Sequence, residues 1–115
     1  MDNIILKKTV ALLRKKAKQN NAKIWDAVAE LLSKPKRRRI YVNISKINRY
    51  SKDGDIIVVP GKVLGAGIIN HKITIGAFKF SESAKKKIEE AGGKCISIID
   101  LVEEQPKGTG VKIIG

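Results

Sequence analysis

The stretch Lys34-Pro35-Lys36-Arg37-Arg38-Arg39-Ile40-Tyr41-Val42-Asn43-Ile44 decides how this chain is organised. Its first six residues hold five cations and no acid, which suits contact with a polyanion and not a hydrophobic core. Pro35 disfavours a helix just before it, because its ring crowds the preceding residue. From Ile40 to Ile44, apolar and polar residues alternate as in a half-buried strand. We therefore expect an exposed basic connector joined to a folded body.

The positive charge of the chain is concentrated in its first half. The sequence has 115 residues and a formal net charge of +13. Residues 1–50 carry 14 Lys and Arg against 3 acids, whereas residues 51–115 carry 10 against 8. A chain of this length buries roughly two thirds of its unfolded surface. These totals predict one compact domain, or a domain with an arm, whose N-terminal half faces a charged partner.

Composition excludes several classes of site. A single cysteine, Cys95, and a single histidine, His71, allow neither an internal disulfide nor a zinc site built from Cys and His. No apolar run approaches the roughly 18 residues that span a membrane, and the N-terminus lacks a secretory apolar segment. We expect a cytoplasmic protein with no cofactor, no metal and no membrane contact.

A helix with two rows of cations is expected over residues 4–20. Leu6, Val10, Leu13 and Ala17 recur at helical spacing and form its apolar stripe. The cations beside the stripe form one row of Lys7, Arg14 and Lys18 and a neighbouring row of Lys8 and Lys15. Because no acids are interleaved with them, these rows favour a binding face over an ordinary solvated face.

A second helix is expected over residues 24–32, after Asn20-Asn21 ends the first. Trp25 offers either a stacking surface for a base or an anchor for the core. A single tryptophan on an apolar helix is typical of packing, and we assign it to the core. The two helices are expected to form a hairpin.

The remainder of the chain predicts an α/β body. Ser45 is expected to cap a short helix that carries Lys46 and Arg49. Ile56-Ile57-Val58-Val59 is typical of a strand buried on both faces, and Pro60-Gly61 is expected to end it.

The last third of the chain predicts a parallel strand-helix-strand unit. Residues 73–80 are expected to form a strand, residues 82–91 a helix and residues 94–97 a second strand. Ser81 and Ser97 are the expected N-caps of this helix and of one more short helix. A helix ending before Pro106 and a final strand within residues 109–115 complete the expectation.

The glycine-rich segment from Gly61 to Gly67 raises the question of nucleotide binding. A phosphate-binding loop needs Lys and Ser or Thr after its last glycine, and these are missing after Gly67. A dinucleotide-binding loop needs a third glycine and an immediate helix, which are also missing. We therefore interpret the segment as a bend between strands.

No group of residues predicts catalysis. His71 lies in an expected loop, Cys95 lies inside an apolar strand, and most acids alternate with lysines on expected helices. We expect no enzymatic activity and no small-molecule substrate. A nucleotide-dependent enzyme built on the glycine bend is kept as a minor alternative.

The basic half predicts binding to nucleic acid. Lys and Arg neutralise phosphates with release of counterions, and Arg also stacks on unpaired bases. With only 4% aromatic residues, recognition of phosphates and shape is favoured over stacking. Tyr41 is the one aromatic residue expected near a base, against the alternative of a half-buried edge residue. A regulatory DNA-binding protein stays open as a rival, although no helix-turn-helix is evident.

Five blocks of sequence, in order, resemble the archaeal and eukaryotic large-subunit ribosomal protein family called eighteen-e. They begin at Lys34, Val58, Phe80, Glu90 and Pro106, reading KPKRRR with VNISKI, VVPGKVLG, FSESA, EAGGK and PKGTGV. The resemblance covers nearly the whole chain, and its length is similar to the archaeal form. The family is related to bacterial large-subunit ribosomal protein fifteen.

The resemblance implies a non-catalytic ribosomal protein that binds large-subunit rRNA and neighbouring ribosomal proteins. It also implies an α/β body of irregular β-β-α turns, preceded by a basic two-helix region. The family's basic motif corresponds to Lys36, Arg37, Arg38, Arg39, Asn43 and Lys46. Its glycine bend corresponds to residues 61–65, where Lys62 is expected to contact RNA.

We therefore expect a structural constituent of the large ribosomal subunit in the cytoplasm, acting in translation. Residues 1–39 are expected to form the basic helical hairpin and connector, and residues 40–115 the globular body. The expected RNA-binding residues are Lys7, Lys8, Arg14, Lys15, Lys18, Lys34, Lys36, Arg37, Arg38, Arg39, Tyr41, Asn43, Lys46, Arg49 and Lys62.

Overall fold

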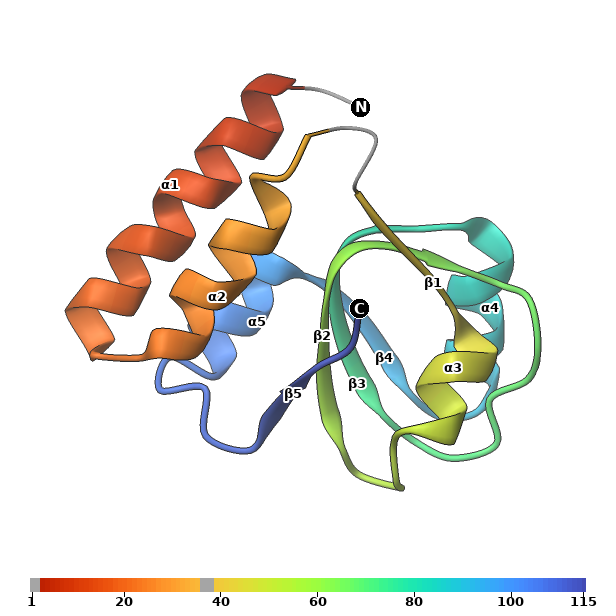
Figure 1. The fold of residues 1–115 in the computed structure, drawn as a ribbon. Coiled ribbons are helices and arrows are strands. Elements are labelled where there is room, and N and C mark those ends of the chain that lie inside the picture. Colours follow the sequence, from red (N-terminus) through yellow and green to blue (C-terminus); the bar gives the residue numbers. More distant parts are fainter. Residues whose placement is uncertain (1–2, 36–38) are drawn as a thin grey trace.

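Helices and strands are mixed along the whole chain (Figure 1). The computed structural model describes residues 3–35 and 39–115, so the expected contacts at Lys36, Arg37 and Arg38 lie outside the described residues. The elements are α1 (Asn3–Asn20), α2 (Lys23–Leu32), β1 (Ile40–Asn43), α3 (Ile44–Arg49), β2 (Ile56–Leu64), β3 (Thr74–Phe80), α4 (Glu82–Glu90), β4 (Lys94–Ser97), α5 (Ile98–Glu104) and β5 (Val111–Ile113). The expected α/β class and the two N-terminal helices are confirmed.

The five described strands form one sheet in which all the described strand pairs are parallel. The order is β1-β2-β3-β4, and β5 also pairs with β2. β5 pairs with Ile56–Val58, whereas β1 pairs with Gly61–Leu64, so both lie along the edge of β2 that faces away from β3. The expected parallel unit of β3, α4 and β4 is confirmed.

The prediction that Pro60-Gly61 ends the second strand is wrong. β2 continues to Leu64, and its pairing with β3 shifts register between Val59 and Lys62. This irregularity accommodates Pro60, which has no N–H to donate. A Cβ on Gly61 would overlap the carbonyl oxygen of Ile40, so glycine lets β1 approach β2 closely.

The predicted cap at Ser45 is also wrong, because β1 leads directly into α3 and Asn43 occupies the N-cap position. The side chain of Asn43 makes no capping hydrogen bond. Ile44 is fully buried, so burial of an apolar residue fixes the start of this helix. By contrast, the expected caps are confirmed: Ser81 Oγ accepts from the N–H of Ala84 at 3.2 Å, and Ser97 Oγ from that of Asp100 at 3.1 Å.

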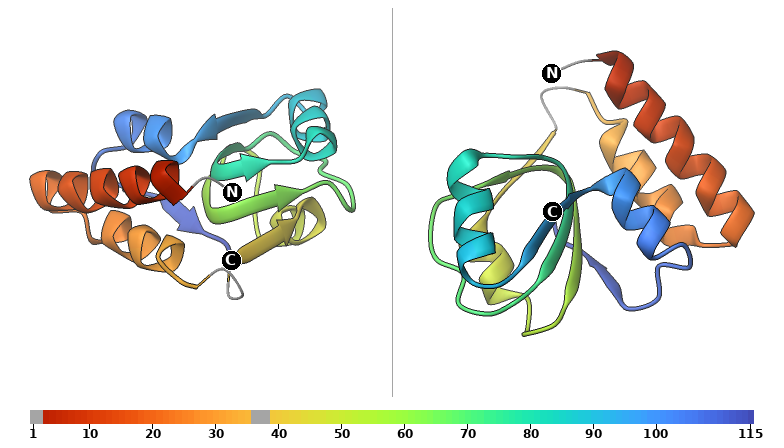
Figure 2. Two further views of the ribbon diagram at one scale, coloured as in Figure 1. Left: turned by 90° about the horizontal axis from the view of Figure 1, so that it is seen from above. Right: turned by 180° about the vertical axis from the view of Figure 1, so that it is seen from behind.

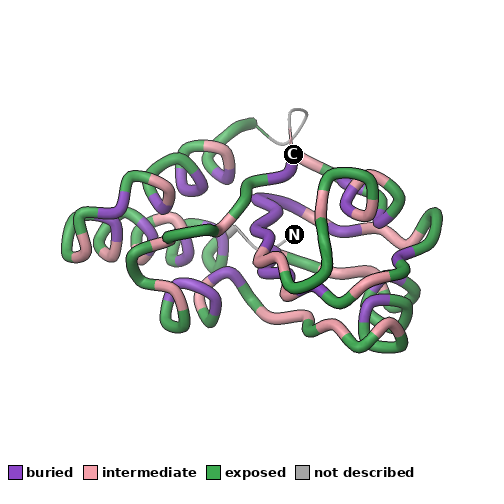
Figure 3. The backbone as a smooth tube through the Cα atoms, turned by 90° about the horizontal axis from the view of Figure 1, so that it is seen from below, coloured by how far each residue is buried: buried purple, intermediate pink, exposed green. Residues whose placement is uncertain are grey.

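Two hydrophobic clusters cover opposite faces of the sheet. Residues of α3 and α4 pack on one face, with Val42, Val59 and Val63 among the strand residues beneath them. Residues of α1, α2 and α5 pack on the other face, around Val58. Seen from behind, α5 lies in front of α2, and α1 lies beside them (Figure 2). Buried and exposed residues alternate along both N-terminal helices, so each presents one face to solvent (Figure 3).

Trp25 joins the N-terminal helices to the body. Its side chain is completely buried, and its Nε1–H donates to the carbonyl oxygen of Pro106 at 3.0 Å. The assignment of Trp25 to packing is therefore confirmed. The division of the chain at residues 39 and 40 stays a prediction, and the helices before it share a cluster with Ile98, Leu101 and Val102 of α5.

Candidate nucleic-acid interface

Most cations of α1 lie on its solvent-exposed side. The helical period places Leu6, Leu13 and Ala17 in the core, and leaves the remaining side of the helix to solvent. The exposed cations on that side are Lys7, Lys8, Arg14, Lys15 and Lys18. Arg14 pairs with Asp26 of α2 at 3.9 Å, where both side chains are about half exposed and the pair adds little stability.

A groove of about 480 Å³ separates the first part of α1 from the end of α2 and the connector. Its apolar lining consists of Leu6, Val10, Ala11, Leu32 and Pro35. Four of the expected RNA-binding residues line it as well: Lys7, Arg14, Lys34 and Arg39. Cations about 30 residues apart in the sequence therefore converge on one surface, which we call the basic groove.

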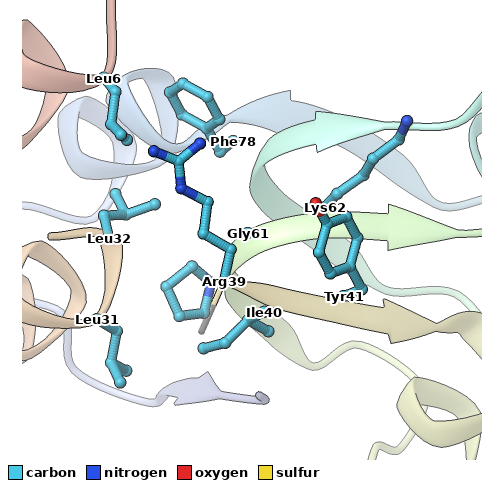
Figure 4. Close-up of a pocket in the computed structure, with 10 residues that line it drawn as sticks. Leu6, Leu31, Leu32, Arg39, Ile40, Tyr41, Gly61, Lys62 and Phe78 are labelled. Carbon is cyan, nitrogen blue, oxygen red and sulfur yellow. The ribbon is translucent and has the colours of Figure 1, made fainter. Parts of the chain in front are cut away.

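Arg39 departs from the expectation of an exposed connector. Its side chain is only partly exposed, and it lines both the basic groove and a cavity of about 10 Å³ beside it. In the close-up of that cavity, the guanidinium group points between Leu6, Leu32 and Phe78 (Figure 4). The end of the connector is therefore packed between the helices and the sheet, whereas Lys34 is exposed.

The cations of α3 are not brought to the basic groove. Lys46 Nζ donates to the main-chain oxygen of Gly115 at 2.6 Å, so it contacts the C-terminal residue. The guanidinium of Arg49 lies 5.8 Å from the centre of the Tyr50 ring. In Figure 1, α3 lies on the opposite side of the sheet from α1 and α2.

Three of the expected contact residues are close together on β1 and β2. Tyr41 and Lys62 are register partners on these strands, and Asn43 lies two residues beyond Tyr41 on the same face. Tyr41 is 56% exposed, as expected for an outward-facing residue. Lys79 of β3 is in turn the partner of Lys62, although it is not among the contact residues selected from the sequence. Strand register places Lys79 next to Lys62, and nothing in the local sequence around Lys79 predicts this position.

The glycine bend after β2 points carbonyl groups, not N–H groups, at a charged side chain. Lys87 Nζ donates to the carbonyl oxygens of Gly65 and Gly67, at 2.8 and 3.0 Å. The carbonyl of Ala66 accepts from the N–H of Ser45 at 3.2 Å. A phosphate site needs the opposite polarity. The interpretation as a structural bend is therefore supported for residues 65–67, whereas residues 61–64 belong to β2.

The side chains considered for catalysis have ordinary structural surroundings. His71 Nε2 lies 2.8 Å from Ser51 Oγ, and His71 Nδ1 lies 3.1 Å from Asn70 Oδ1. Burial, with a smaller effect of Glu89, raises the pKa of the Cys95 thiol to about 11, which disfavours the reactive thiolate. Within residues 3–35 and 39–115, no three His, Cys, Asp or Glu residues are grouped to hold a metal ion.

No helix in the described ranges combines the length and apolar character needed to cross a membrane.

Comparison with known proteins identifies the family. The model of the family described as ribosomal protein 60S L18 and 50S L18e matches residues 1–115. Large ribosomal subunit protein eL18 of Methanococcus maripaludis is 49% identical over 102 residues, which cover 89% of this chain and 85% of that protein. The protein of the same name from Pyrobaculum aerophilum is 46% identical over 112 residues, covering 97% and 92%. That of Methanothermobacter thermautotrophicus is 48% identical over 107 residues, covering 93% and 88%. The resemblance noted in the sequence is thereby confirmed, and the chain belongs to the family of large-subunit ribosomal proteins described as 60S L18 and 50S L18e.

Proposed function

We propose that this chain binds large-subunit rRNA through phosphate contacts from its basic N-terminal half and stabilises the packing of rRNA segments for translation. Its family makes it a structural constituent of the large subunit of the cytoplasmic ribosome. What we propose is how the protein is attached to the rRNA of that subunit. Neighbouring large-subunit proteins are its further partners, on surfaces outside the basic groove.

The observation that carries the proposal is the convergence of four cations on the basic groove. Lys7 and Arg14 come from α1, whereas Lys34 and Arg39 come from the connector. The ion pair described at this surface, between Arg14 and Asp26, is long and solvated, so it competes weakly with a phosphate. Each cation that contacts a phosphate releases condensed counterions and adds to a salt-dependent affinity. Because the folded domain holds several such cations in fixed positions, their phosphate contacts fix the orientation of the protein on RNA.

The other expected contact residues that lie on helices form two groups. Lys8, Lys15 and Lys18 extend the exposed side of α1 and would contact phosphates further along the RNA. Lys46 and Arg49 lie on the far side of the sheet. If they contact RNA, they contact a different segment. A protein with two such faces holds separate rRNA segments together.

The proposal is tested by removing three groove charges together, as Lys7→Gln, Arg14→Gln and Lys34→Gln. Binding of the full chain to large-subunit rRNA is measured across a range of salt concentrations. Each lost phosphate contact lowers the slope of log K against log salt by about 0.7 to 0.9, so the triple variant should lower it by about 2 to 3. All three residues are exposed, so the circular dichroism spectrum should not change.

A matched control removes the same charge from the other half, as Lys52→Gln, Lys72→Gln and Lys85→Gln. These three lysines are exposed and lie outside the basic groove. The control triple should keep most of the native affinity and slope. An equal loss in both triples would mean that net charge alone drives binding, and the proposal of a localised groove would then be abandoned.

A further inference from the structure

Three exposed or partly exposed side chains lie side by side across β1, β2 and β3. The register pairs Tyr41 with Lys62, and Lys62 with Lys79. The next residues along these strands are Val42, Val63 and Phe80, which all contact the cluster beneath α3 and α4. Since successive side chains of a strand point to opposite faces, Tyr41 and Lys62 point away from that cluster, and the strand register places Lys79 beside Lys62 in the same row. We call this row the strand platform.

The two lysines of the strand platform are neighbours without a compensating acid. Like charges directly opposite each other in a sheet are destabilising. Within the described ranges, neither the Lys62 nor the Lys79 ammonium group forms an ion pair or hydrogen bond. Other lysines of the body do have such partners, for example Lys94 with Glu104 at 3.1 Å. An anion bound between Lys62 and Lys79 would remove their repulsion.

Tyr41 adds an exposed aromatic ring next to these two charges. Its 56% exposure shows that the ring is not needed to fill the core. A ring stacks on any base through its π-face, and flanking cations bind the phosphates on either side. The chemical combination of one ring and two ammonium groups therefore fits a nucleotide better than an inorganic anion, which makes no use of the ring.

The strand platform is continuous with the basic groove. Arg39, two residues before Tyr41, lines the groove and also lines the small cavity that Tyr41 and Lys62 line (Figure 4). An RNA strand that left the groove at Arg39 would therefore reach Tyr41 next. We propose that the strand platform binds one unpaired nucleotide of large-subunit rRNA, with its base on the Tyr41 ring and its adjacent phosphates on Lys62 and Lys79. This inference rests on the proposed function and specifies which form of RNA the protein selects.

The chain supplies a matched pair of tyrosines for the test. Tyr41 is 56% exposed in the platform, and Tyr50 is 58% exposed at the end of α3, beside Arg49. Tyr41→Leu and Tyr50→Leu are compared in binding to a single-stranded RNA oligonucleotide and to the same sequence as a duplex. Tyr41→Leu should weaken single-strand binding by about 5- to 140-fold, the range that corresponds to loss of one stacked base, and should leave duplex binding unchanged. Tyr50→Leu should change neither, and Tyr41→Phe should keep the native affinity.

The lysines are tested separately through salt dependence. Lys62→Gln with Lys79→Gln should lower the single-strand slope by about 1.4, whereas Tyr41→Leu should weaken binding without changing the slope. If Tyr41→Leu behaves as Tyr50→Leu while the groove triple still loses affinity, the platform inference is overturned and the proposed function stands. If the groove triple retains full affinity, the proposed function fails, whatever Tyr41→Leu does. If the platform variants bind both RNAs normally but are lost from purified large subunits, the face binds a neighbouring protein instead.

Discussion

The lysines and arginines of the basic groove have different surroundings from the lysines of the globular body. In the body, Lys87 donates to two carbonyl oxygens of the glycine bend, and Lys94 and Lys112 pair with acids at 3.1 and 2.9 Å. At the groove, the described ion pair between Arg14 and Asp26 spans 3.9 Å between half-exposed side chains. Cations of one kind therefore hold parts of the fold together, whereas Lys7, Arg14 and Lys34 face solvent around an apolar floor, with the partly buried Arg39 beside them.

This difference separates charge that stabilises from charge that binds. Exposed ion pairs contribute about 0 to 1 kcal/mol each, so the body lysines that have such partners add at most a small stabilisation to the fold. The exposed groove cations, Lys7, Arg14 and Lys34, contribute little to folding, and their value lies in contacts with a partner. Lys16 is an exception within α1, since it pairs with Glu103 of α5 at 3.3 Å and serves the fold. Stability and rRNA binding should respond to different substitutions.

The largest effect is expected where the helices that carry the groove are anchored. Trp25→Ala removes a completely buried ring and its hydrogen bond to Pro106. The free energy of unfolding should fall by about 3 to 5 kcal/mol, measured from urea midpoints. Trp25→Phe keeps most of the volume and should cost about 1 to 2 kcal/mol from the lost hydrogen bond and reduced packing. If the free energy of unfolding of Trp25→Ala were within about 1 kcal/mol of the native value, the helices would not be anchored through this residue.

A smaller effect is expected for a body lysine with structural partners. Lys87→Gln removes the ammonium group that donates hydrogen bonds to the carbonyl oxygens of Gly65 and Gly67. This change should lower the free energy of unfolding by about 1 kcal/mol. Lys85→Gln on the same helix is the control, because the Lys85 side chain is exposed and makes no hydrogen bond or ion pair in the described structure. Both variants should bind rRNA like the native protein. If Lys87→Gln and Lys85→Gln had the same free energy of unfolding, the hydrogen bonds of Lys87 would not stabilise the fold.

Local signals predicted most elements of the fold. The caps at Ser81 and Ser97 depend on hydrogen bonds to residues three positions later, and both are visible in the sequence. The continuation of β2 through Pro60 was not predictable in this way. It depends on β1, which pairs with the second half of β2 across about 20 residues of chain. The cap at Asn43 was missed because the burial of Ile44, not a capping side chain, fixes that helix start.

For the candidate site, the sequence predicted which cations are exposed on α1 but not how the cations are grouped in space. Helical period alone placed Lys7 and Arg14 on the solvent side of α1, as observed. Their convergence with Lys34 depends on how α2 packs against α1, which no local pattern encodes. The partial burial of Arg39 and the pairing of Lys79 with Lys62 likewise depend on tertiary packing and strand register. Residue types were therefore identified from the sequence, and their grouping required the structure.

The smallest effect is expected at Asp55, whose partner Lys112 ties β5 to β2. The hydrogen bond from Lys112 Nζ at 2.9 Å, followed by that from the N–H of Lys52, lowers the pKa of the Asp55 carboxyl from its ordinary value. Because this pKa is lower in the folded than in the unfolded chain, the carboxylate stabilises the fold above the unfolded pKa and loses this effect as the pH falls through the folded pKa. Asp55→Asn should therefore lower the urea midpoint slightly at neutral pH, and the difference from the native protein should fade in acid. Lys112→Gln, which removes the main cause of the lowered pKa, should reproduce most of the loss at neutral pH. A loss that is the same at both pH values would assign the effect to packing, and this lysine would then no longer count among the charges that stabilise the body.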